Sequence, residues 1–221
     1  MANSVYIDNK SVRASIERIQ REYSYLSESA LNTAISRALN RTVSQGRTAA
    51  NRDIRKTYNV SASRINNEIK TRNSSTTNLE AMVVASGAPL SMNNFQAKED
   101  KPKGTTSFNR KGVASSRLNR RAKSNAVKGV TMTIRKGKTM NLPTAFIQLS
   151  NGGITVFARG VYKGTSEGFE FGKARLPIGK ITTLSIPMMM ANDTVLKPVS
   201  RELEEVFDRR ITHEVGRLLS M

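Results

Sequence analysis

The chain has 221 residues, no cysteine, and 36 lysines and arginines against 17 aspartates and glutamates, which gives a formal net charge of +19. This length suits one domain, or one domain with helical additions. The lack of cysteine excludes disulfides, thiolate zinc sites, iron–sulfur clusters and cysteine nucleophiles. The excess of cations favours a polyanionic neighbour, and nucleic acid, anionic lipid and an acidic protein surface all meet that description.

The N-terminal segment lacks the basic patch and apolar run of a signal peptide. No stretch of the sequence approaches the ~18 consecutive apolar residues that a membrane-spanning helix needs. We therefore expect a soluble protein that makes no contact with a membrane.

Two amphipathic helices are predicted in the N-terminal third. Apolar residues recur at spacings of three and four over residues 12–26, and Ser11 precedes them as a candidate N-cap. The same period continues over residues 31–54, where Gly46 interrupts the pattern. Glycine costs ~1 kcal/mol against alanine inside a helix, so Gly46 predicts a bend.

A short third helix follows the second after a break at residues 58–60. Ser61 can cap it, and Ile65 and Ile69 are its apolar positions. Residues 48–70 thus have a helix–turn–helix outline, which DNA-reading domains use to set a helix in the major groove. The side chains available to contact bases there are those of Ser63, Arg64, Asn66, Asn67 and Lys70. Short helix pairs serve packing far more often than base reading, so we expect residues 48–70 to be a packing element.

Alternating apolar and polar residues predict an antiparallel sheet in the second half of the chain. The predicted strands cover residues 79–85, 130–134, 145–149, 154–157 and 181–186. Asn151, Gly152 and Gly153 predict a tight hairpin between two of them, because Asn and Gly tolerate the positive φ of such turns. Pro187 is expected to end the last strand, since proline has no N–H for the ladder.

A C-terminal helix is predicted over residues 199–218, with Pro198 near its first turn. We expect the apolar stripe of this helix to form an assembly surface, with Val199, Leu203, Phe207, Ile211 and Leu218 as its residues. The fold class is therefore α+β, with a central antiparallel sheet flanked by the long N-terminal helices and the C-terminal helix. Its expected parts are a helical region 1–72, a β region 77–186 and a C-terminal helix 187–221, in one compact unit.

Residues 98–128 predict a long basic loop, and no acidic residue occurs from Lys101 to Ser166. Loops this long are usually functional or disordered. The candidate contacts to DNA or another polyanion are Lys101, Lys103, Arg110, Lys111, Arg117, Arg120, Arg121, Lys123 and Lys128. The alternative is a solvated loop that keeps a basic protein soluble.

No catalytic pattern is found. His213 is the only histidine, and the second histidine of a metalloprotease helix is absent. The sequence also lacks a nucleophile elbow and a phosphate-binding glycine loop. Acidic and basic residues alternate on the C-terminal helix, as on a solvated or subunit face. We therefore expect no enzymatic activity, no metal and no cofactor.

Several short segments together resemble the phage minor tail protein Z family. In chain order they are Leu31–Ala34 and Arg41–Thr42, Pro89–Met92, Ala145–Phe146, Val156–Arg159, Arg175–Ile178 and Leu184–Met188. The resemblance runs from about residue 25 into the C-terminal helix, and its specificity comes from the order of the segments, since each one is short. The long basic loop matches no feature of the family.

The resemblance implies a structural virion protein, namely a tail completion protein of lambda-like long-tailed phages that acts at the head-proximal end of the tail, near the DNA end. It also implies assembly in the host cytoplasm with other tail or neck proteins. Taken with the basic charge, it suggests a homo-oligomeric ring that contacts phage DNA without sequence specificity. The alternative is a sequence-specific DNA-binding regulator that uses residues 48–70. An RNA-binding protein fits less well, because aromatic residues for base stacking are few.

Overall fold

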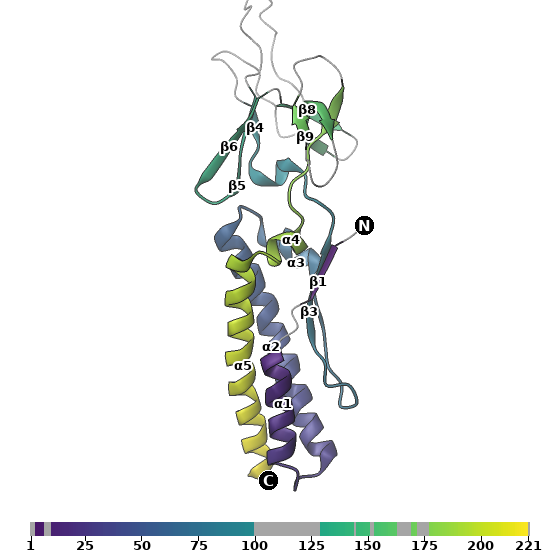
Figure 1. Ribbon diagram of the computed structural model, residues 1–221, viewed down its shortest axis with the longest axis vertical. Helices are drawn as coiled ribbons and strands as arrows, with labels where there is room; N and C mark the ends of the chain where they lie inside the picture. Colours follow the sequence, from purple (N-terminus) through teal and green to yellow (C-terminus); the bar gives the residue numbers. More distant parts are fainter. Residues whose placement is uncertain are drawn as a thin grey trace, which may run out of the picture. The chain divides into compact units, whose positions relative to one another are not determined.

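The computed structural model describes residues 3–6, 10–99, 129–143, 145–150, 153–162, 169–171 and 177–220. The chain divides into two compact units, a helical unit of Met1–Ala88 with Leu184–Met221 and a strand unit of Pro89–Thr183. Figure 1 shows the long helices of the first unit and the short strands of the second. The α+β class is confirmed, with antiparallel sheets, long N-terminal helices and a C-terminal helix.

The helical unit is built on three long helices, α1 (Lys10–Glu22), α2 (Glu28–Thr57) and α5 (Asp193–Leu219). Ser27 caps α2 and Asn192 caps α5, each by accepting a backbone N–H of the first turn. The apolar stripes of the three helices meet in one core, made by Ile16, Ile19, Leu31, Ile35, Ala38, Leu39, Phe207, Ile211 and Val215. The apolar residues at spacings of three and four in the sequence are thus the residues that form this shared core.

Helix α2 runs without interruption through Gly46, so the expected bend is replaced by close packing. A Cβ atom at this position would lie 2.4 Å from Cδ2 of Leu203 on α5 and 3.3 Å from Cγ2 of Val83. Gly46 therefore lets α5 and a strand approach the α2 backbone more closely than any other residue would.

A small antiparallel sheet completes the helical unit. Its strands are β1 (Asn3–Tyr6), β2 (Ile69–Arg72) and β3 (Met82–Gly87), in the order β1-β3-β2. Val83 and Ala85 of β3 are buried, which follows the predicted alternation. Two short helices, α3 (Ala62–Glu68) and α4 (Ile186–Met190), belong to the same unit.

The strand unit contains two further antiparallel sheets. Its elements are η1 (Met92–Phe95), β4 (Lys98–Glu99), β5 (Val130–Arg135), β6 (Lys138–Leu142), β7 (Ala145–Ser150), β8 (Gly153–Tyr162), β9 (Phe169–Phe171) and β10 (Ile178–Lys180). One sheet has the order β4-β5-β6, and the other has the order β10-β8-β7 with β9 also paired to β8. Ser150 pairs with Gly153 across the β7–β8 turn, which confirms the predicted hairpin.

The structure corrects two boundaries near the C-terminus. Residues 181–186 are not a strand: β10 ends at Lys180, and Thr182 forms only an isolated bridge to Ser91. Ser185 instead caps α4 by accepting the N–H of Met188, and the following proline occupies the first helical turn, where no N–H is needed. Pro198 lies inside α5, because Asn192 starts that helix earlier than its apolar stripe indicates.

The domain boundaries also differ from those expected. The strand over residues 82–87 packs with the helices, and the chain returns to the helical unit at Leu184. The reason is that β3 pairs with β2, which continues directly from α3. None of the described helices is long and apolar enough to cross a membrane.

Replacing Gly46 by alanine is expected to lower the free energy of unfolding by about 1 kcal/mol. Overpacking against Leu203 costs roughly 1–3 kcal/mol, which outweighs the ~1 kcal/mol that alanine gains over glycine in a helix. Gly216 on α5 is the matched control, since a Cβ there meets no atom within 4 Å. Gly216→Ala should therefore stabilise the protein by up to ~1 kcal/mol. Urea unfolding followed by circular dichroism measures both variants, and equal stabilisation by both would contradict the packing role of Gly46.

Candidate functional site

The nine basic loop residues expected to contact a polyanion, Lys101 to Lys128, lie outside the described residues. Four of the five side chains expected to form an assembly surface, those of Val199, Leu203, Phe207 and Ile211, are buried within the helical unit. Leu218 is partly exposed. The apolar stripe of α5 therefore packs inside the chain, and the charged side of the helix is the part that remains accessible.

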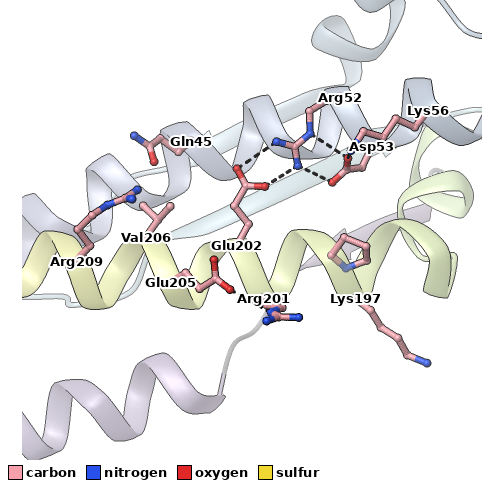
Figure 2. Close-up of a pocket in the computed structure, with 11 residues that line it drawn as sticks. Gln45, Arg52, Asp53, Lys56, Lys197, Arg201, Glu202, Glu205, Val206 and Arg209 are labelled. Atoms are coloured by element: carbon pink, nitrogen blue, oxygen red, sulfur yellow. Dashed lines mark hydrogen bonds and ion pairs between the residues drawn. The ribbon is translucent and has the colours of Figure 1, made fainter.

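An open groove of about 670 Å³ lies between α2 and α5, within the helical unit. Figure 2 shows Arg52 of α2 at its centre, between Asp53 of the same helix and Glu202 of α5. Nη2 of Arg52 lies 2.9 Å from Oδ2 of Asp53 and 2.6 Å from Oε2 of Glu202. Nε of Arg52 donates to Oδ1 of Asp53 at 3.0 Å, and Nη1 donates to Oε1 of Glu202 at 3.4 Å. The guanidinium thus binds both carboxylates through two donor pairs and cross-links the helices.

Asp53 is the buried member of this network, with its side chain only 4% exposed. The hydrogen bonds from Arg52 hold the pKa of the Asp53 carboxyl below its usual value, and Nζ of Lys56 at 2.9 Å acts in the same direction against the opposing effect of burial. Both carboxylates in turn raise the pKa of Arg52, with the Asp53 hydrogen bond as the larger cause. Asp53 and Arg52 are therefore charged at neutral pH, and their ion pair has a structural role.

Most other charges of this groove are also paired. Lys197 binds Asp193 at 2.9 Å and Arg201 binds Glu205 at 3.1 Å, each within one turn of α5. Arg209 is the exception, because it makes no ion pair with the described residues. The residues that line the α2–α5 groove carry five cations and three carboxylates, a net charge of +2, but among these cations Arg209 alone has no carboxylate partner within the described residues.

A second groove, of about 610 Å³, has a different character. It is lined by Arg37, Asn40, Arg41, Ser44, Thr71, Asn73, Glu214 and Arg217, all within the helical unit. Every one of these side chains is polar. Arg37 and Arg41 are exposed and make no ion pair with the described residues, while Arg217 binds Glu214 at 3.1 Å. We refer to it as the arginine groove.

Ser74 holds one wall of the arginine groove against α2. Its backbone N–H donates to Oδ1 of Asn40 at 2.8 Å, and Nδ2 of Asn40 donates to the Ser74 carbonyl at 3.1 Å. Oγ of Ser74 also lies 3.0 Å from Oγ of Ser36, one turn away on the same helix. This reciprocal clamp fixes the segment that follows β2 and so positions Asn73 at the groove, whereas Thr71 is held within β2 by its pairing with β3.

The structure also places the helix–turn–helix outline. Nδ2 of Asn51 donates to Oδ1 of Asn66 at 2.7 Å, and Nη2 of Arg47 donates to the Asn66 carbonyl at 2.9 Å. Arg64 forms an ion pair with Glu68 on the same face of α3. Several polar groups that could have faced bases are therefore engaged within the protein, as expected of a packing element.

Sequence reasoning missed the arginine groove, although the sequence holds a signal for it. No acidic residue occurs on α2 between Glu28 and Asp53, while Arg37 and Arg41 stand one turn apart. The contact between Ser74 and Ser36 had no such signal, because the two residues are far apart in the chain. Among the described residues, no group of three or more histidine, aspartate or glutamate side chains could hold a metal ion.

Comparison with known proteins identifies a family. A family model described as prophage minor tail protein Z matches residues 14–221, which is nearly the whole chain. Neither the curated proteins nor the solved structures gave a match.

Replacing Asp53 by Asn should lower the free energy of unfolding by about 1–3 kcal/mol at neutral pH, because it removes the buried partner of two partly exposed cations. The folded pKa of Asp53 lies below its ordinary value of 3.8, so the unfolded state binds more protons in acid. The contribution is therefore complete above about pH 5 and is lost as the pH falls through 3.8 and then through the folded pKa.

Urea unfolding of both proteins from neutral pH to pH ~3 should show the stability gap closing in acid. Glu205→Gln, which removes an exposed pair on α5, is the control and should change stability by less than ~1 kcal/mol. A gap between wild type and Asp53→Asn that stays constant across this range would show that the carboxylate charge contributes nothing.

Proposed function

Because the chain belongs to the prophage minor tail protein Z family, we propose that it completes a phage tail at the head-proximal end, as one subunit of a homo-oligomeric ring near the DNA end. Family membership indicates a structural role in the tail of the virion and contacts with other tail proteins. The observation that carries the proposal is the extent of the match, since residues 14–221 include α2, α5, most of α1 and both sheets of the strand unit.

The helical unit supports such a role by its construction. A ring subunit must transmit load between neighbours without changing shape, and α2 and α5 are joined both by a buried apolar core and by the Arg52 cross-link. The charged side of α5 stays exposed beside that core. Closed rings need complementary patches on each subunit, and ion pairs arranged along one helix face provide a pattern that a neighbour can match.

We propose a non-enzymatic role as well. The carboxylates of the α2–α5 groove are held by Arg52, Lys56 and Arg201, so they are engaged in structural ion pairs. General acid–base work needs a carboxylate that can exchange its proton near the working pH. Asp53 does not meet this requirement, because its pKa is lowered by Arg52.

The assembly proposal is tested by swapping one ion pair on the exposed side of α5. The double variant Arg201→Glu with Glu205→Arg keeps the net charge and the i,i+4 pair but inverts the surface pattern. We expect it to unfold like the wild type yet fail to form rings on tail tubes in negative-stain microscopy, and to give particles with incomplete tails. Normal rings and normal infectivity would show that this side of α5 is not an interface.

The same preparation separates this proposal from the regulator alternative. A tail protein should copurify with particles, whereas a regulator should dimerise and protect one duplex sequence over competitor DNA. Arg64→Ala with Asn67→Ala should leave tail completion intact. A sequence-specific footprint that disappears in this variant would favour the regulator.

We also propose that the basic loop contacts phage DNA or an acidic neighbouring protein. Changing Arg117, Arg120, Arg121 and Lys123 to Glu should reduce infectivity and DNA retention while leaving thermal unfolding unchanged. Backbone neutralisation carries no sequence information, so binding should fall with salt with a log–log slope of ~0.9 per phosphate contacted. Normal infectivity and normal DNA retention would instead favour a solvated loop.

A further inference from the structure

The arginine groove holds positive charge that the protein itself leaves unpaired. Arg37 and Arg41 stand one turn apart on α2, where like charges repel each other. Neither makes an ion pair with the described residues, and the single carboxylate of the groove, Glu214, is bound by Arg217. Three arginines and one glutamate leave the groove with a net charge of +2. An external anion would remove the repulsion between the two arginines.

The groove also presents hydrogen-bonding groups without partners. The hydroxyl groups of Ser44 and Thr71 and the side-chain amide of Asn73 make no hydrogen bond with the described residues. Asn40 differs, because the Ser74 clamp uses both ends of its amide. The groove therefore combines free guanidinium groups with small neutral hydrogen-bonding groups from α2, from β2 and from the segment that the Ser74 clamp holds.

This composition points to phosphate and away from a protein surface. Protein interfaces are usually anchored by Trp, Tyr and Arg packed in a pocket that excludes water, and this groove offers arginine with no apolar or aromatic side chain beside it. Arginine together with Ser, Thr and Asn is the set of side chains that typically contacts the phosphate oxygens of nucleic acid.

We propose that the arginine groove binds the sugar–phosphate backbone of nucleic acid without sequence specificity. Arg37 and Arg41 bind phosphates, Ser44, Thr71 and Asn73 donate to phosphate oxygens, and Glu214 weakens binding by its negative charge. The benefit to a tail rests on the proposed position near the DNA end, but the binding itself is a property of the isolated protein. Loss of DNA binding by the isolated protein is therefore distinguishable from failure of the proposed role in tail completion.

The test uses the purified full chain and two fluorescent DNA duplexes of unrelated sequence, titrated over a range of salt concentrations. Arg37→Gln with Arg41→Gln removes two cations and keeps good helix formers on α2. Loss of two phosphate contacts should reduce the log–log salt slope by about 1.8 and weaken binding on the order of 60-fold at 0.1 M salt, for both duplexes alike. Arg18→Gln with Arg55→Gln is the control, because these exposed residues make the same change in net charge outside the groove.

A third variant gives the opposite sign. Glu214→Gln raises the charge of the groove from +2 to +3, so it should tighten binding to both duplexes. The proposal is overturned if Arg37→Gln with Arg41→Gln loses no more affinity than the control pair, or if one duplex is affected and the other is not. It is also overturned if the groove variants change binding to an acidic polyglutamate peptide and leave DNA binding unchanged, since the occupant would then be a protein.

Discussion

The close packing of α2 against α5 is the constraint on which the rest of the helical unit depends. Gly46 removes the one side chain that would hold the two helices apart, and Leu203 occupies the space it leaves. The apolar stripes of both helices then close over α1 in a common core. A few residues along, Arg52 bridges the same pair of helices through Asp53 and Glu202. Apolar packing and ion pairing thus fix the same interface at successive turns.

This arrangement divides the cations of the helical unit into two groups. Arg52, Lys56 and Arg201 are neutralised within the protein, and Arg52 also joins α2 to α5 through Glu202. Arg37 and Arg41 lie on the same helix as Arg52 but face a groove without a free carboxylate. The formal net charge of the chain therefore does not by itself predict where a partner binds, because only the cations without a carboxylate partner attract one.

Family membership and the geometry answer different questions. The match over residues 14–221 assigns the protein to the phage tail, whatever the details of its surface. The geometry then indicates which parts are available for contact, since the apolar stripe of α5 is used within the chain while its charged side is exposed. Exposed charges of this kind favour solubility of the free chain.

The sequence by itself determined the elements whose signal is local. Helical periodicity placed α1, α2 and α5, the Ser61 cap placed α3, and Asn151 with two glycines placed the β7–β8 hairpin. It also identified the family, because the short segments that resemble the family, and their order along the chain, can be recognised without any knowledge of the fold. The strand predicted over residues 181–186 was wrong, because strand and helix-cap signals overlap there. Ser185 caps α4 instead.

Only the tertiary structure decided what depends on contacts between distant residues. The burial of Val199, Leu203 and Phe207 could not be separated from an assembly surface by periodicity, since both uses require the same apolar stripe. The role of Gly46 likewise needed its partner on α5, more than 150 residues later in the chain. The arginine groove could not be predicted either. The hydrogen bond between Ser36 and Ser74 joins residues far apart in the chain, and the sequence does not show which partner a polar side chain will contact.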